Sequence, residues 1–180
     1  MDLSTYSHSF SIKNKISRLI WNLIRLVLFR PFVSRLFKKW RVFILKCFGA
    51  KIEWSSHIYA SVKIWAPWNL EMGANSSLGP NVDCYNQGRI SIGANTVISQ
   101  KTYLCASTHD YTKKDFPLIL KPIKIGNGVW IAADAFVGPG VTIGSDVVIA
   151  ARSVVIKNVE ENSILGGNPA TFIKQKIKNI

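Results

Sequence analysis

The chain has 180 residues, enough for one domain with a continuous core and an appendage. Its formal net charge of +13 lies mostly at the N-terminus: residues 1–52 hold eleven Lys or Arg and one acidic residue, whereas residues 53–180 hold twelve and nine. Because the basic segment is also strongly aliphatic, nucleic acid is disfavoured as a partner. Three cysteines without metal-ligand spacing are typical of a reducing compartment and argue against a disulfide framework.

The first 49 residues are expected to form a basic, amphipathic helical segment. Residues 1–15 are polar and unpatterned, and we expect a loose arm there. Apolar residues at helical spacing then predict one helix over residues 16–30 and a second over residues 32–48. Pro31 separates the two helices, and Gly49 is suited to cap the second one at its C-terminus.

Neither helix is expected to span a membrane. The longest stretch without a charge, Leu19–Ile24, has six residues, against the ~20 that a span needs. A secretory signal peptide is not expected either, because arginines interrupt the apolar part. Two roles remain open. A basic, aromatic helix pair can lie in the interface of an anionic membrane, or it can cover the start of the following domain and a neighbouring subunit.

Residues 50–180 are organised around a repeat of six residues. From Ile125 to Val159 an aliphatic residue returns at every sixth position, and a small or β-branched residue follows each one four positions later. The same period begins less regularly at Ile52, is reset near residues 85–89, and resumes from Ile92 to Leu104. The aliphatic positions of the regular part are Ile125, Ile131, Val137, Ile143, Ile149 and Val155.

A period of six fits neither an isolated helix nor an alternating strand, and it is typical of a parallel β-helix. Three units close one coil, so residues eighteen apart stack with their aliphatic side chains inward. Gly, Asn and Asp between the strands supply turns, several of which need positive φ. We therefore predict an all-β domain of about five coils that ends in a short basic helix. A β-sandwich is less compatible, because its turn signals come every ~8–12 residues.

The repeat is interrupted from His109 to Lys124, and such an excursion from a solenoid is often a binding loop. His109 lies where the repeat meets this excursion, and imidazole is well suited to general-base work near neutral pH. Asp110 follows directly and can orient an imidazole, although neighbours on a strand point to opposite sides. No metal is expected, because the three histidines lie in unrelated places and a catalytic zinc takes about three such ligands.

Residues 92–173 resemble the hexapeptide-repeat acyltransferases. The segments that carry the resemblance are ISQKTYLCASTHDY, PIKIGNGVWIAADAFVGPGVTIG, VIAARSVV and GGNPA. They are similar to galactoside and maltose O-acetyltransferases, and closer still to exopolysaccharide acetyltransferases of the colanic acid type. The segments LFRPF and FGAKI also resemble the N-terminal part of this second group. The resemblance implies a left-handed coil, a homotrimer and acetyl-CoA as the donor.

The resemblance also implies roles for single residues. His109 matches the general base, which takes a proton from an acceptor hydroxyl that attacks the acetyl thioester directly. Ala133 and Ala151, eighteen residues apart, match the small side chains of a pantetheine groove between adjacent subunits. Further positions that match coenzyme A contacts are Ile156, Lys157 and Lys174. Trp130 matches the tryptophan of the family's VWI motif, and we expect it either in the core or at the groove wall.

The acceptor site is the part that the sequence defines least. Asn81 and Asn86 are both candidates for the acceptor-binding asparagine that these enzymes carry upstream of the histidine. We expect an O-acetyltransferase that acts on a sugar hydroxyl in polysaccharide or exopolysaccharide biosynthesis, in the cytoplasm or at the inner face of the membrane. An N-acetyltransferase on an amino-sugar nucleotide and a non-catalytic trimeric scaffold are the alternatives.

Overall fold

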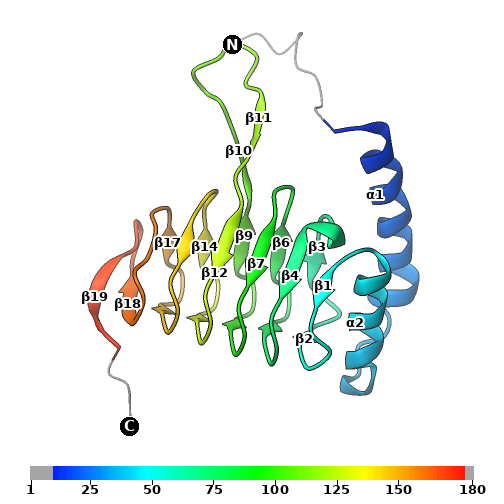
Figure 1. Ribbon diagram of the computed structural model, residues 1–180, viewed down its shortest axis with the longest axis horizontal. Coiled ribbons are helices and arrows are strands. Elements are labelled where there is room, and N and C mark those ends of the chain that lie inside the picture. Colours follow the sequence, from blue (N-terminus) through cyan, green and yellow to red (C-terminus); the bar gives the residue numbers. More distant parts are fainter. Residues whose placement is uncertain (1–9, 177–180) are drawn as a thin grey trace.

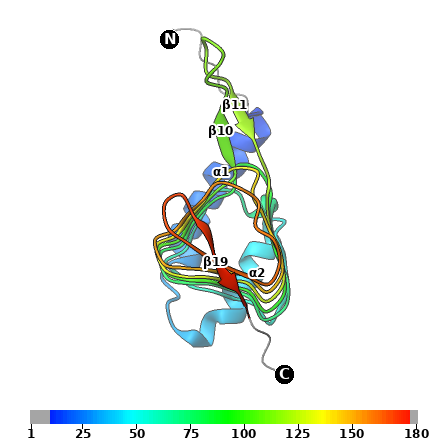
Figure 2. The same cartoon turned by 90° about the vertical axis from the view of Figure 1, so that its left-hand side faces the viewer.

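The computed structural model describes residues 10–176, and it is a parallel β-helix with helices at its N-terminal end (Figure 1). Figure 2 looks along the stacked coils. Each coil has three flat faces, which we name A, B and C in the order in which the chain visits them. The chain makes five complete coils and begins a sixth, in agreement with the expected fold.

Each face is a sheet of parallel strands. Face A consists of β1 (Lys51–Ile52), β4 (Leu70–Met72), β7 (Ile90–Ile92), β12 (Ile123–Ile125) and β15 (Thr142–Ile143). Face B consists of β2 (His57–Ile58), β5 (Ser77–Leu78), β8 (Val97–Ile98), β13 (Trp130–Ile131), β16 (Val148–Ile149) and β18 (Ser163–Gly166). Face C consists of β3 (Lys63–Ile64), β6 (Asp83–Tyr85), β9 (Tyr103–Cys105), β14 (Phe136–Val137) and β17 (Val154–Val155).

The stacking predicted for the regular half of the chain is confirmed. Residues eighteen apart pair in register on all three faces, and their aliphatic side chains fill the interior. The three pairs are Ile125 with Ile143, Ile131 with Ile149, and Val137 with Val155. Gly128 and Asp146, one above the other at successive turns, both have positive φ, as expected for these positions.

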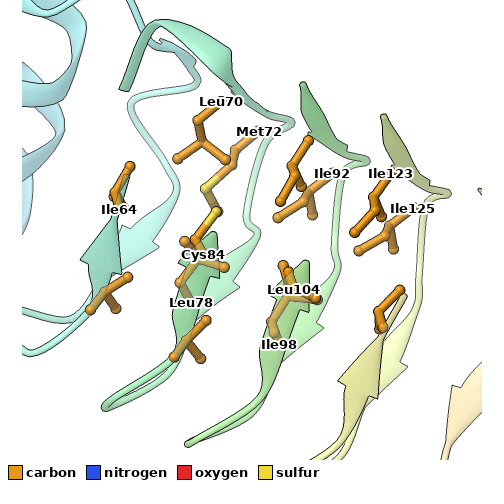
Figure 3. Close-up of a cluster of buried hydrophobic side chains, with 14 of the residues drawn as sticks. Ile64, Leu70, Met72, Leu78, Cys84, Ile92, Ile98, Leu104, Ile123 and Ile125 are labelled. Carbon is orange, nitrogen blue, oxygen red and sulfur yellow. The ribbon is translucent and has the colours of Figure 1, made fainter. Parts of the chain in front are cut away.

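The first coils are longer than the sequence pattern predicted. Lys51 pairs with Glu71, and Glu71 with Ser91, so these coils advance by twenty residues. The extra residues lie where face C turns into face A, which we call the C–A corner; the first coil has a 3-10 turn there, η3 (Pro67–Asn69). The inward positions are therefore Leu78 and Cys84 rather than Ser76 and Val82, which the six-residue period would place there. Figure 3 shows Ile64, Cys84 and Leu104 in line through this interior.

The N-terminal segment is helical over most of residues 12–47. It comprises α1 (Ile12–Ile24), a π-helical continuation η1 (Arg25–Phe29), a 3-10 turn η2 (Arg35–Phe37) and α2 (Lys38–Cys47). The first helix begins earlier than predicted, because Ser11 caps it: the Ser11 hydroxyl accepts a hydrogen bond from Asn14 N at 3.2 Å. The expected loose arm thus does not extend to residue 15, and residues 1–9 lie outside the described part. Gly49 has positive φ after α2, as predicted.

The helices close the open end of the first coil. Trp21 of α1 donates from Nε1 to the Ile64 carbonyl at 2.7 Å, and Arg41 of α2 donates from Nε to the Ile58 carbonyl at 2.7 Å. Both side chains are fully buried. Within the part of the chain that the structure describes, no helix is both long and apolar enough to cross a bilayer.

The expected short C-terminal helix is absent up to residue 176. Residues 171–175 instead form the strand β19 (Thr171–Gln175), which pairs antiparallel with β18. The physical reason is that β18 would otherwise leave an unpaired sheet edge, and Thr171, Phe172 and Ile173 are strand-forming residues. Residues 177–180, which belonged to the predicted helix, lie outside the described residues.

Candidate active site

A hairpin leaves the C–A corner of the third coil and projects beyond the solenoid (Figure 1). Its strands are β10 (Ser107–His109) and β11 (Leu118–Leu120), which pair antiparallel with Ser107 opposite Leu120. Lys121 N donates to the Ala106 carbonyl at 3.0 Å and closes the base of the hairpin. The predicted excursion at residues 109–124 therefore corresponds to a hairpin that starts two residues earlier, and β12 has already begun at Ile123.

His109 ends the first strand of the hairpin, and its ring is oriented by the backbone. Nδ1 lies 2.6 Å from the carbonyl oxygen of Phe116. Because a carbonyl can only accept, Nδ1 carries the proton in the neutral ring, and Nε2 is then the nitrogen with the lone pair. Phe116 has a φ of 46°, which is uncommon for a bulky residue. The turn thus holds a strained backbone conformation at the point where its carbonyl meets the imidazole.

Asp110 makes its contacts within the hairpin loop. Its Oδ1 accepts hydrogen bonds from the Thr112 hydroxyl at 2.6 Å and from Thr112 N at 3.1 Å, and its Oδ2 lies 3.9 Å from Lys113 Nζ. The hydrogen bond from the Thr112 hydroxyl is the main cause that holds the pKa of this carboxyl below its ordinary value. These contacts stabilise the loop, and an orienting contact from Asp110 to His109 stays a prediction.

A shallow apolar groove of about 520 Å³ runs across the third, fourth and fifth coils, where face B turns into face C. We call this edge the B–C corner. The groove is lined by Ser99, Gln100, Trp130, Ala132, Ala133, Val148, Ala150 and Ala151. Small side chains dominate the lining, so the groove is open and apolar.

Three of the predicted donor-site residues meet in this groove. Ala133 and Ala151 occupy equivalent places in successive coils, since Arg152 N donates to the Ala133 carbonyl at 2.9 Å. The Trp130 side chain is 51% exposed and donates from Nε1 to the Ser99 hydroxyl at 3.0 Å. Of the two placements that the sequence left open, core or groove wall, the structure has the groove wall.

The other predicted donor contacts lie elsewhere on the surface. Ile156 and Lys157 are exposed and follow β17 at the C–A corner, the same corner that carries the hairpin. Lys174 is exposed on β19 and pairs with Ile164 of β18. The structure therefore brings together Trp130, Ala133 and Ala151, but places the remaining three residues on two other edges of the solenoid.

The two candidate acceptor asparagines differ sharply in environment. Asn81 is exposed in a turn, with a φ of 58°. Asn86 is fully buried: its Oδ1 accepts from Trp65 N and from Ala66 N, both at 3.0 Å, and its Nδ2 donates to the Ala66 carbonyl at 2.5 Å. The amide of Asn86 thus joins the C–A corners of the first two coils.

Sequence reasoning missed Phe116, whose carbonyl orients His109, and missed Ser99 and Gln100 in the groove. The last two could have been found, because Ile98 and Ile131 are equivalent positions across the excursion. Stacking these coils places Ser99 and Gln100 beside Ala132 and Ala133. Among residues 10–176, no three His, Cys, Asp or Glu side chains gather closely enough to hold a metal ion.

Stacked six-residue repeats, a projecting hairpin with a histidine, and a groove of alanines define a hexapeptide-type transferase. The family described as bacterial transferase hexapeptide (six repeats) matches residues 122–157. A putative colanic acid biosynthesis acetyltransferase, WcaF of Escherichia coli, is 41% identical over 179 residues, which is 98% of each chain. Galactoside O-acetyltransferase of Escherichia coli is 32% identical over 110 residues, which cover 59% of this chain and 54% of that protein.

A solved structure supports the same fold. The hexapeptide-repeat acetyltransferase of Vibrio cholerae, in complex with acetyl coenzyme A, superposes with a TM-score of 0.82 and 24% sequence identity, covering 96% of this chain and 94% of that one. The chain belongs to the hexapeptide-repeat acetyltransferases, in the group represented by the colanic acid enzyme.

Proposed function

We propose that this protein is an acetyl-CoA-dependent O-acetyltransferase that acetylates a sugar hydroxyl during exopolysaccharide biosynthesis. The observation that carries the proposal is His109, whose Nδ1 is held by the Phe116 carbonyl where the first strand of the projecting hairpin ends. The name of the full-length relative, a putative colanic acid biosynthesis acetyltransferase, supports the substrate class.

His109 would act through Nε2. With the proton of the neutral ring on Nδ1, Nε2 would accept the proton of the acceptor hydroxyl as its oxygen attacks the thioester carbonyl. The resulting imidazolium then returns the proton to the departing coenzyme A thiolate, so the reaction forms an ester without an acyl-enzyme. A backbone N–H near the thioester would stabilise the tetrahedral oxyanion. The Phe116 carbonyl would stabilise the imidazolium, because Nδ1–H continues to donate to it.

The apolar groove would hold the pantetheine arm. Ala133 and Ala151 leave room for the chain of the donor, and Trp130 would form its wall. The groove lies at the B–C corner and the hairpin at the C–A corner, on opposite edges of face C. We therefore propose a homotrimer in which the hairpin of one subunit meets the groove of the next. Ile156, Lys157 and Lys174 would then contact the remainder of coenzyme A, the lysines near its phosphates.

The acceptor would be a lipid-linked or nucleotide-linked glycan intermediate. Such intermediates place the enzyme in the cytoplasm, near the inner face of the membrane. Of the two asparagines, Asn81 is free to contact an acceptor from the surface, whereas a contact by Asn86 would require its buried amide to leave the backbone of residues 65–66.

The test is acetyl transfer from acetyl-CoA to deacetylated polysaccharide intermediates, with the wild type compared with His109→Ala. Removal of a general base lowers kcat by a factor of about 10²–10⁴. Lys114→Ala, an exposed substitution in the same hairpin, is the matched control and retains activity. If His109→Ala keeps wild-type kcat with an unchanged melting temperature, His109 is not the base.

The product distinguishes O-acetylation from N-acetylation. An ester is cleaved by hydroxylamine at neutral pH, whereas an amide survives the same treatment. Loss of the acetyl group from the purified product is the expected result. A resistant product would replace the proposed reaction with amide formation, and failure of the protein to bind acetyl-CoA in calorimetry would favour a non-catalytic scaffold.

A further inference from the structure

The first helix carries an apolar stripe on the side that faces away from the solenoid. Ile12, Ile16, Leu19, Ile20 and Leu23 are all exposed, with Leu19 at 71% and Leu23 at 63%. At about 100° per residue these positions fall within an arc of about 100°, and the buried Trp21 lies on the opposite side. The stripe continues into η1 through Leu26 and Val27, which are also exposed. We call this surface, from Ile12 to Val27, the outward stripe.

Lysines border the outward stripe, and the described part of the N-terminal segment carries no acidic residue. Residues 10–52 contain eleven Lys or Arg and no Asp or Glu. Lys13 and Lys15 are exposed and flank the stripe on its two sides at helical spacing. Arg18 instead packs over the Trp65 ring at 3.7 Å, and Arg41 is buried, so these two side chains serve the packing of the helices.

We propose that the outward stripe docks α1 and η1 in the interface of an anionic lipid bilayer. An amphipathic helix with large apolar side chains on one side and lysines at the border binds bilayers in this way, lying in the plane of the interface. Each Lys or Arg near an anionic surface adds about 1 kcal/mol. The segment meets both conditions, because its stripe is apolar and its border is basic.

A second copy of the chain is a poorer occupant of this surface. A symmetric contact between two stripes would bring the two basic borders together, and like charges in contact are unfavourable. Acidic side chains on the rest of the chain offer little compensation. Residues 53–180 contain nine acidic residues, and five of them already pair with basic side chains: Glu71, Asp83, Asp110, Asp134 and Asp146.

Docking would fix the orientation of the enzyme. Because Trp21 and Phe29 pack inward, the outward stripe points away from the first coil, and the coils would rise from the membrane one above another (Figure 1). The hairpin leaves the third coil, two steps of about 4.8 Å above the first. With one helix of about 10 Å between, the root of the hairpin would stand about 20 Å above the bilayer surface. This height suits a lipid-linked acceptor, and that point rests on the proposed function. The docking proposal itself does not depend on the proposed function.

The experiment is co-flotation of the full-length protein with vesicles of phosphatidylcholine, with and without 30% phosphatidylglycerol. Leu19→Ser with Leu23→Ser is expected to lower the partition coefficient at least tenfold. Lys13→Gln with Lys15→Gln is expected to lower it about fivefold per lysine on the anionic vesicles alone. The matched controls keep wild-type flotation: Val97→Ser with Leu120→Ser, and Lys101→Gln with Lys124→Gln, all exposed on the solenoid or the hairpin.

Three results would overturn the proposal. One is wild-type flotation of the double leucine variant with an unchanged melting temperature. Another is equal binding of the wild type to neutral and anionic vesicles. The third is a change of oligomeric state in the leucine variant without lipid, which would make the stripe a subunit contact. Acetyl transfer to a soluble acceptor, measured in parallel, separates the two hypotheses: retained activity with lost flotation supports docking and leaves the proposed function intact.

Discussion

Asn86→Ala separates a structural role for this asparagine from an acceptor-binding one. The substitution removes three buried hydrogen bonds, two accepted from Trp65 N and Ala66 N and one donated to the Ala66 carbonyl. Only Ala66 N is left without a partner, which costs about 1–3 kcal/mol. Trp65 N keeps the Cys84 carbonyl at 3.2 Å and the Ala66 carbonyl keeps Asn69 N at 3.0 Å, so the loss of each of these two bonds costs about 1 kcal/mol. Together these contributions give an expected loss of about 3–5 kcal/mol in the free energy of unfolding.

The assay is thermal unfolding at one fixed protein concentration, because an oligomer melts at a temperature that depends on concentration. A loss of this size lowers Tm by about 10 °C in a chain of this length. Asn81→Ala is the control. Asn81 is exposed with positive φ, where Ala costs only about 1–2 kcal/mol, so its Tm falls far less.

Kinetics at a temperature well below both transitions complete the test. A structural role predicts that Asn86→Ala leaves the KM for the acceptor within about twofold of the wild type. An unchanged Tm together with a tenfold higher acceptor KM would refute the reasoning, and would assign Asn86 to the acceptor site despite its burial.

Three further predictions concern the groove, the core and pH. Ala151→Phe fills the groove from an exposed position, so the KM for acetyl-CoA should rise at least tenfold in steady-state assays while Tm is unchanged. Leu104→Ala should lower the unfolding free energy by about 3–5 kcal/mol in urea titrations, because Leu104 is fully buried, whereas Leu120→Ala at an exposed site should cost less than about 1 kcal/mol. The pKa of His57 is lowered from its usual value of about 6.5 by burial and by nearby cations. The contribution of the neutral ring to stability is therefore present above that pH and is lost as the pH falls through the lowered pKa. His57→Gln should weaken this pH dependence in thermal melts between pH 5 and 8. The cations are Arg41, Lys38 and Arg35.

The regular half of the β-helix could be predicted from sequence because each coil there repeats one physical demand. Ile125, Ile131 and Val137 fill the same interior places as the residues eighteen positions later. The inward residues of the first two coils could not be predicted, because two extra residues at the C–A corner shift every later position relative to the six-residue period. Cys84 is inward only once that shift is known, and Val82 is buried as well, at a corner.

Part of the candidate groove could be predicted from the sequence. Ala133 and Ala151 lie in one groove as their spacing suggested. Phe116 could not be found, because its contribution is a carbonyl whose direction depends on a positive φ that the residue type does not favour. The C-terminal strand was missed because the local pattern does not reveal which sheet edge β18 leaves open.

Every departure from the six-residue period lies at one corner of the coil. The spacing from an inward residue on face A to that on face B is constant, as from Ile52 to Ile58 and from Ile125 to Ile131, and the C–A corner alone holds the widened turns and the hairpin. In a solenoid, insertions confined to one corner leave the stacking at the other corners unchanged. The groove at the B–C corner depends on such stacking, because its small side chains come from successive coils. If the proposed function holds, the groove that takes the pantetheine arm is therefore protected by the regular part of the fold, while the hairpin beyond His109 can change its length and sequence to suit a different acceptor.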